Sequence, residues 1–147
     1  MALNTRISNA AAKAACDAIV DLLDGGSGAA VIKGYTASQA TDPDTAIGAQ
    51  TLLFTLVCSD PAFGNAADAN PGGRATASAV TSDSSADATG TLAWVRASSS
   101  NDGSTALNAV IDGEAGTSGA DFNFNTVAIV SGATVSLTSW TVTMPES

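Results

Sequence analysis

Residues 134–144, Thr-Val-Ser-Leu-Thr-Ser-Trp-Thr-Val-Thr-Met, alternate apolar and polar side chains with a period of two, the pattern of a half-buried β-strand. The apolar set changes from odd to even numbers within the stretch: Val135, Leu137, Trp140, Val142 and Met144. Both subsets can face one core only if the strand contains an extra residue. The pattern therefore predicts a β-bulge near Thr138-Ser139. The alternative is a strand that is covered on both faces, as at a subunit interface.

The chain between residue 28 and this strand continues in short segments bounded by turn-forming residues. The predicted strands are 29–35, 51–57, 74–80, 89–97, 106–111, and 122–124 with 127–130. The turn formers between them are Asp42-Pro43-Asp44, Asp60-Pro61, Pro71-Gly72-Gly73, Asn101-Asp102-Gly103, Asp112-Gly113 and Ser131-Gly132. This spacing predicts a mainly β fold, an antiparallel β-sandwich of jelly-roll or immunoglobulin-like type. The uneven strand lengths favour a sandwich over a barrel.

The first 28 residues differ, because their apolar side chains recur at helical spacing. A helix is predicted over residues 5–24, capped by Asn4 or Thr5 and ended by a left-handed residue at Gly25-Gly26. Its apolar arc is mostly alanine and contains Ile7, Ala11, Ala14, Ala15, Ala18, Ile19 and Leu22. The opposite, polar face carries Arg6, Asn9, Lys13, Asp17 and Asp24.

These patterns divide the chain into two parts. Residues 1–28 form an amphipathic helix and a Gly-rich hinge, and residues 29–147 form the β-sandwich domain. The alanine-rich arc either packs on the sheet of its own domain or contacts a neighbouring subunit. If it contacts a neighbour, and if the last strand is covered on both faces, the candidate interface residues are Ile7, Ala11, Ala14, Ala18, Leu22 and Trp140.

The composition predicts a thin core. Hydrophobic residues make up 45% of the 147, but 30 of them are alanine. A buried alanine gains about one methyl group's transfer free energy, against ~1.5–3 kcal/mol for Leu, Ile, Val or Phe. We therefore expect part of the stability to come from partner chains. Disorder is disfavoured by the mean hydropathy of +0.21.

The charge of the chain bears on its partners. The formal net charge is −9, and the five basic residues are scattered along the sequence: Arg6, Lys13, Lys33, Arg74 and Arg96. No basic patch can neutralise phosphates, so nucleic-acid binding is not expected. The acidity keeps the exposed surface soluble and can steer the protein toward a basic partner.

No membrane or export segment is expected. No run reaches the ~18 consecutive apolar residues of a membrane span, and the N-terminal region lacks the charged-then-apolar layout of a signal peptide. We therefore expect synthesis and assembly in the cytoplasm and no membrane partner. Cys16 and Cys58 are then expected to be buried free thiols, and a disulfide between them would require a later oxidising environment.

Residues suited to catalysis are few. The chain has no histidine, the commonest general base and nitrogen ligand, and two distant cysteines do not make a zinc site. Close carboxylate pairs occur at Asp42/Asp44, Asp83/Asp87 and Asp112/Glu114. Such pairs can serve a glycosidase or a calcium site, but we favour the interpretation that they begin turns and cap loops. We expect no catalytic residue, no metal and no cofactor. Trp94 is expected in the core, with an exposed sugar platform as the alternative.

Four runs carry a likeness to known proteins: residues 32–39 leading to Asp42-Pro43-Asp44, residues 60–64, residues 81–91 with Trp94, and residues 121–145. In these runs and their order, the chain resembles a family of small Ala/Gly/Ser/Thr-rich proteins encoded by tailed phages and prophages. The likeness spans most of residues 31–145 and includes no catalytic motif. The first 28 residues are its least typical part.

The resemblance implies a non-enzymatic virion structural protein. Head decoration, or cement, proteins are the preferred assignment within that class; they commonly sit as trimers on the outer capsid and bridge major capsid subunits. The implied partners are the major capsid protein and further copies of this chain, as a homotrimer, and no small-molecule ligand is implied. Tail, collar and fibre-associated proteins share this composition and are an alternative. A carbohydrate-binding module for the host surface is a second alternative.

Overall fold

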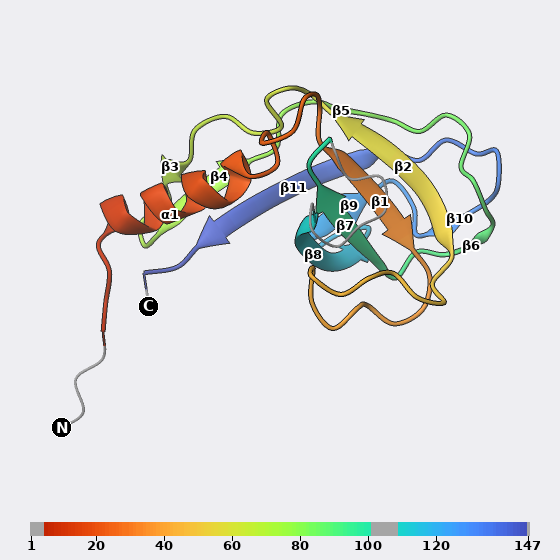
Figure 1. Ribbon diagram of the computed structural model, residues 1–147, viewed down its shortest axis with the longest axis horizontal. Helices are drawn as coiled ribbons and strands as arrows, with labels where there is room; N and C mark the ends of the chain where they lie inside the picture. The colour runs from red at the N-terminus through yellow and green to blue at the C-terminus, as the bar shows by residue number, and fades with distance from the viewer. Residues whose placement is uncertain (1–4, 101–108, 147) are drawn as a thin grey trace.

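The computed structural model describes residues 5–100 and 109–146. Within them the protein is mainly β with one N-terminal helix, as the sequence predicts (Figure 1). The helix is α1 (Asn9–Asp21). The strands are β1 (Val31–Tyr35), β2 (Leu52–Cys58), β3 (Ala67–Asp68), β4 (Gly73–Thr76), β5 (Val80–Thr81), β6 (Gly90–Thr91), β7 (Trp94–Ser98), β8 (Ala109–Gly116), β9 (Phe122–Phe124), β10 (Ala128–Ile129) and β11 (Leu137–Met144).

The described strands form one large curled sheet and one small sheet. The large sheet has the order β3-β4-β11-β9-β8-β7-β1-β2-β5, and β10 pairs with β6. All pairs are antiparallel except β8 and β9, which run parallel because residues 117–121 loop the chain back. Two backbone hydrogen bonds between Asp83 and Val135, of 3.0 and 2.8 Å, join the segment after β5 to the segment before β11. The sheet is therefore mixed, and the sandwich type stays a prediction.

The predicted turn at Asp112-Gly113 is wrong, because both residues lie in the middle of β8. The charge of the Asp112 carboxylate is balanced there by Arg96, which is directly opposite on β7, so the side chain can be buried. Gly113 is required for packing rather than for a turn: a Cβ at this position would lie 2.6 Å from the ring of Phe122. The first part of the predicted strand 106–111 and the predicted turn at 101–103 lie outside the described residues.

Two other predicted strands are interrupted. The segment 74–80 is divided into β4 and β5, and the segment 89–97 into β6 and β7. In each gap the backbone changes partner: Ala77 still donates to Trp140 of β11 but Ser78 donates to Ala62, and Leu92 donates to Val127 beside β10 but Ala93 donates to Tyr35 of β1. The short strand β3 was not predicted.

The predicted β-bulge is confirmed. The pairing of β11 with β9 runs from Leu137↔Phe124 to Ser139↔Asn123, so Thr138 is the extra residue. Beyond the bulge, Trp140 pairs with Phe122, and the second half of the strand pairs with β4. β11 therefore belongs to two parts of the molecule, with residues 137–140 in the main body and residues 141–144 extending out of it.

The helix is shorter than predicted at both ends. It begins after Ser8, whose extended backbone and side-chain oxygen, 3.2 Å from the N–H of Ala11, form the N-cap in place of Thr5; Asn4 lies outside the described residues. The chain before the cap bonds elsewhere, since Ile7 donates to the carbonyl of Glu146. The prediction of a left-handed end at Gly25-Gly26 is wrong. The helix instead ends in successive i→i+3 hydrogen bonds through residue 25.

The helix packs on the part of the sheet that leaves the body. It contacts β3, β4 and β11, and Figure 1 shows it lying alongside the second half of β11, away from β1 and β2. A Cβ on Gly73 would lie 2.5 Å from Cα of Lys13, so the backbones of α1 and β4 touch at this glycine. We call α1, β3, β4 and residues 141–144 of β11 the arm. The division at residues 28/29 stays a prediction, although buried residues of α1 belong to the same core cluster as those of the sheet.

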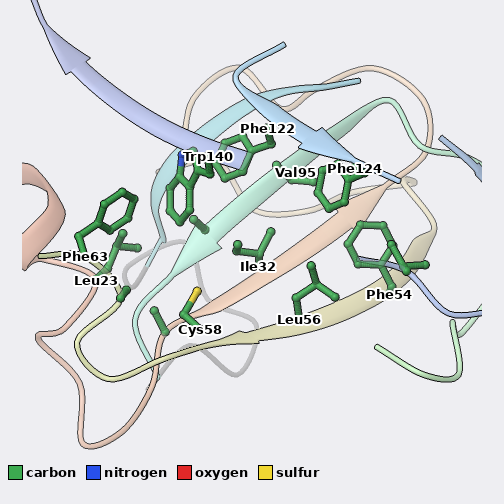
Figure 2. Close-up of a cluster of buried hydrophobic side chains, with 14 of the residues drawn as sticks. Leu23, Ile32, Phe54, Leu56, Cys58, Phe63, Val95, Phe122, Phe124 and Trp140 are labelled. Atoms are coloured by element: carbon green, nitrogen blue, oxygen red, sulfur yellow. The ribbon is translucent and has the colours of Figure 1, made fainter. Parts of the chain in front are cut away.

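The core is aromatic at both ends (Figure 2). In the body, Phe54 packs on Phe124 with ring centroids 5.3 Å apart. At the junction with the arm, Trp140 stacks on Phe122 at 4.4 Å and meets the edge of Phe63 at 4.6 Å. These rings supply much of the large apolar surface that the alanine-rich composition lacks.

Candidate interaction surface

The apolar arc predicted for the helix is turned toward solvent. We call Ile7, Ala11, Ala14, Ala18 and Leu22 the outer face of α1. All five residues are exposed, and Ile7 and Leu22 are 40% and 60% exposed. Large apolar side chains at such exposure are uncommon on the described surface, where the others are Val57 and Val130. The structure thus brings together five of the six candidate interface residues.

A different stripe of the helix is buried. Ala12, Cys16, Val20 and Leu23 each have 0–1% of their surface exposed, and the thiol of Cys16 donates to the carbonyl of Val142 at 3.6 Å. The stripe is narrow and mostly small, which allows the close contact with β4 at Gly73. Of the two alternatives for the alanine-rich arc, packing on the sheet of its own domain is therefore wrong, because the opposite side of the helix takes that position.

Three residues of the predicted polar face anchor the helix, whereas Arg6 on the same face is exposed. The side-chain oxygen of Asn9 accepts from the backbone N–H of Gly72 at 3.0 Å, and that of Asp24 accepts from Ala62 at 2.8 Å. Asp17 likewise accepts from the N–H of Ala66. The three side chains accept hydrogen bonds from backbone N–H groups that lie in loops. The bonds to Asp17 and Asp24 are the stronger ones, because their acceptors are charged. They hold α1 with its outer face exposed.

Trp140, the sixth candidate interface residue, lies in the core and not on the surface. Only 2% of it is exposed, between Phe63 and Phe122 (Figure 2). The bulge at Thr138 explains this position, because it returns the even-numbered residues of β11 to the inner face. The alternative of a strand buried on both faces is not found within the chain, since Thr141 and Thr143 are exposed.

The buried ion pair between Arg96 and Asp112 was not predicted from the sequence. The guanidinium of Arg96 makes two 2.7 Å hydrogen bonds to the carboxylate of Asp112, and the two side chains are 3% and 2% exposed. It also donates to the backbone carbonyls of Thr45 at 2.8 Å and Asp42 at 3.0 Å. Arg96 thereby fixes loop 36–51 to the outer side of β7. The sequence feature that could have predicted this pair is the single arginine within an apolar strand, because a buried arginine requires a buried acceptor.

Trp94 lies beside this ion pair. It is 1% exposed, stacks on Tyr35 with centroids 4.9 Å apart, and has the guanidinium carbon of Arg96 5.6 Å from its ring centroid. The prediction that it is a core residue is confirmed. Loop 36–51 itself encloses a cleft of about 420 Å³ lined by Ala, Ser, Thr, Gly and Gln, without a charged side chain.

Two members of the carboxylate pairs, Asp42 and Asp83, make local hydrogen bonds. Asp42 accepts from the hydroxyl of Thr45 at 2.7 Å, and Asp83 accepts from the N–H of Ser85 at 2.9 Å, as expected for residues that begin turns. Asp112 instead pairs with Arg96. In the described ranges, no three Asp, Glu or Cys side chains gather in a way that could hold a metal ion.

Both cysteines are buried free thiols, as predicted. Burial raises the pKa of Cys58 to about 11, and the nearby carboxylate of Asp24 adds to the effect. Burial also raises the pKa of Cys16. A thiol whose pKa is raised carries little thiolate near neutral pH, and the thiolate is the reactive form. The two side chains therefore act as small apolar core residues.

Comparison with family models, curated proteins and solved structures gave no match. No helix in the part of the chain that the structure describes is long and apolar enough to cross a membrane.

Proposed function

We propose that this chain is a non-enzymatic structural protein of a tailed-bacteriophage virion, and that it acts as a head decoration protein that bridges major capsid subunits. It would be assembled in the host cytoplasm and act in the particle as an oligomer, most simply a trimer. The observation that carries the proposal is the outer face of α1, which stays exposed while the opposite side of the helix is fixed to the arm. The sequence runs described above supply the class of particle.

The outer face suits docking by its shape as well as its polarity. The alanines Ala11, Ala14 and Ala18 let another backbone approach closely, and Leu22 and Ile7 at its ends can each bury a large side chain. Each copy would bury a modest area. Repetition over a lattice multiplies such weak contacts, because a protein held at one contact meets the next at high effective concentration.

We further infer that the curled sheet is a variant of the predicted sandwich, in which the two opposed layers are halves of one continuous sheet. Phe54 and Phe124 face each other across the core from strands that are not neighbours, as side chains of two opposed sheets do. A carbohydrate-binding role is disfavoured, because Trp94 and Trp140, the two tryptophans that could offer a sugar platform, are both buried.

The copy number of the chain in purified particles tests the proposal. Quantitative mass spectrometry against the major capsid protein should give a ratio near one to one for a decoration protein. A handful to a few dozen copies per particle would place the chain in the tail, collar or fibre instead. Absence from the particle would overturn the structural assignment.

Ala18→Glu tests the docking face. The charge would be buried without a partner at the interface, so we expect incorporation into particles to fall about tenfold or more. Ala128→Glu, at an exposed alanine on β10 in the body, is the matched control and should leave incorporation unchanged. Circular dichroism of both purified variants checks that they fold. Equal incorporation of the two variants would exclude the outer face as the docking surface.

A further inference from the structure

The parallel pair of β8 and β9 leaves part of the sheet unfilled. β9 begins at Phe122 and pairs with β8 only at Ala115 and Gly116. Before β9 the chain turns away, held by hydrogen bonds between Asn123 and Ala120 of 3.2 and 3.0 Å. The two strands that flank β9 extend beyond its first residue. On one side lie residues 109–114 of β8, and on the other lie residues 141–144 of β11, in the arm. The strand position between them, which we call the lane, has no strand among the described residues.

The edge of β11 that borders the lane has free strand positions. Ala77 donates to the carbonyl of Trp140, which places the backbone groups of Trp140 on the β4 side. Backbone direction alternates along a strand, so Val142 also faces β4, where it pairs with Ala75. Thr141 and Thr143 must then point their N–H and C=O groups to the opposite side, which is the lane.

The edge of β8 that borders the lane is arranged similarly. Ala115 donates to the carbonyl of Ala93, on the β7 side. The backbone N–H of Glu114 points to the lane side and donates to the carboxylate of Asp121 at 3.0 Å. By the same alternation, Asp112 turns its backbone groups toward the lane while its side chain is held by Arg96.

The lane forms a groove on the protein surface, with an apolar inner side and a polar outer side. It has a volume of about 230 Å³ and is lined by Ile111, Asp112, Asp121, Phe122 and residues 140–143. The inner side is apolar, with Ile111, Phe122, Trp140 and Val142. The outer side carries the exposed carboxylate of Asp121 next to the exposed Thr141 and Thr143, and the exposed Glu114 lies on β8 beyond the lining residues. No basic residue lines the groove.

We propose that the lane receives an extended segment of a partner polypeptide, which adds a strand between β8 and β11. Backbone hydrogen bonds to Thr141, Thr143 and Asp112 would provide affinity, as in other cases of strand addition. Side chains alternate in such a segment: those facing inward are apolar and meet Ile111 and Val142, and one facing outward is Lys or Arg and meets Asp121 and Glu114. The charge complementarity identifies a basic partner segment, because a second copy of this chain, at net charge −9, supplies few cations.

The edge sequence supports this assignment. An open strand edge in a stable protein is normally protected by a charged side chain, a proline or a bulge. Thr141, Val142 and Thr143 carry none of these, and Pro145 follows only after the strand ends. The inference does not rest on the virion assignment, because it concerns a groove in the isolated chain.

The test is peptide binding to the purified, isotope-labelled chain, followed by amide chemical shifts and hydrogen exchange. The probe is acetyl-Thr-Val-Lys-Val-Thr-amide at millimolar concentration. We expect saturable shifts and slowed exchange centred on the amides of Thr143, Thr141 and Asp112. The same peptide with Glu in place of Lys should bind at least about tenfold more weakly, and a peptide with N-methylated valines should not bind, because it cannot form the strand hydrogen bonds.

Two variants check the site. Thr143→Pro removes an N–H that points into the lane and is not used by β4, a position where a strand tolerates proline; it should abolish binding, whereas Thr143→Val should keep it. Asp121→Asn keeps the acceptor for Glu114 but removes the charge, and should reduce the preference for the Lys peptide. If Thr143→Pro disturbs the amide spectrum of the arm, the Asp121→Asn and N-methyl results decide. The proposal is overturned by no saturable shift, by shifts centred elsewhere, or by equal binding of the N-methylated peptide.

Discussion

Phe54 on β2 packs against Phe124 on β9, with ring centroids 5.3 Å apart and ring planes at 57°, although β8, β7 and β1 lie between these strands in the sheet. The contact is possible only because the sheet curls until its two halves face each other. Figure 2 shows the two rings closing the body end of the core, opposite the cluster at Trp140. In a chain whose hydrophobic residues are nearly half alanine, such contacts carry a large share of the stability.

Removal of either ring should therefore destabilise the whole body. We expect Phe54→Ala and Phe124→Ala each to lower the free energy of unfolding by about 3–5 kcal/mol, measured by urea denaturation. The double variant should show a coupling of about 0.5–1.5 kcal/mol. Val130→Ala, at a residue that is 57% exposed, is the control and should change stability by less than about 0.5 kcal/mol. Strict additivity of the two Phe variants would contradict the contact.

Gly73→Ala tests the contact between α1 and β4. The added methyl would lie 2.5 Å from Cα of Lys13 and 2.7 Å from the carbonyl of Ala12, both backbone atoms. The helix must shift, and we expect faster amide hydrogen exchange in α1 and faster labelling of Cys16 by a thiol reagent. Gly64→Ala is a matched control, because nothing lies within 4 Å of its Cβ position. Unchanged exchange in α1 of Gly73→Ala would show that the helix does not lie on β4.

The ion pair of Arg96 and Asp112 should be more costly to break than to replace. Arg96→Met leaves the carboxylate of Asp112 buried without a cation, and we expect a loss of about 3–5 kcal/mol in the free energy of unfolding. Replacing both residues, with Arg96→Met and Asp112→Leu, removes the buried charge altogether. This double variant should recover a substantial part of the loss in urea denaturation. A double variant no more stable than the single one would argue against an uncompensated charge as the cause.

The pKa of Cys58 predicts a loss of stability at alkaline pH. Burial raises the pKa from 9.0 to about 11, so the folded state holds the thiol proton where the unfolded state has released it. The stabilisation is fully present below pH 9 and is lost as pH rises toward 11. We expect the free energy of unfolding to fall more steeply over this range in the wild-type protein than in Cys58→Ala. Parallel pH profiles for the two proteins would rule out this linkage.

The bulge in β11 could be predicted because its cause is local. A side chain in a strand alternates sides regardless of what the strand packs against, so the change of parity between Leu137 and Trp140 requires an extra residue wherever the strand lies. The same reasoning gave the mainly β class and the position of most strands. The two thiols and Trp94 were also predicted as buried, since these residue types are usually buried.

The side of α1 that packs on the sheet could not be predicted, because the helix offers two stripes of small apolar residues. By composition, the arc of Ala11, Ala14 and Ala18 is as suitable for packing as the stripe of Ala12, Cys16 and Val20. The choice depends on distant residues: Gly73 allows the backbones to touch, and loop N–H groups at Ala62 and Gly72 need the acceptors that the polar face supplies. These partners are known only once the chain is folded.

The exposure of the outer face, the burial of Trp140 and the lane beside β11, which holds no strand of the described residues, have the same origin. Each depends on which strands become neighbours, and strand pairing joins residues that are far apart in the sequence. Alternation and spacing determined by themselves that this chain forms short strands, a bulged last strand and one helix. Only the tertiary structure decided which faces and edges are left exposed, because that follows from long-range contacts that no local pattern encodes.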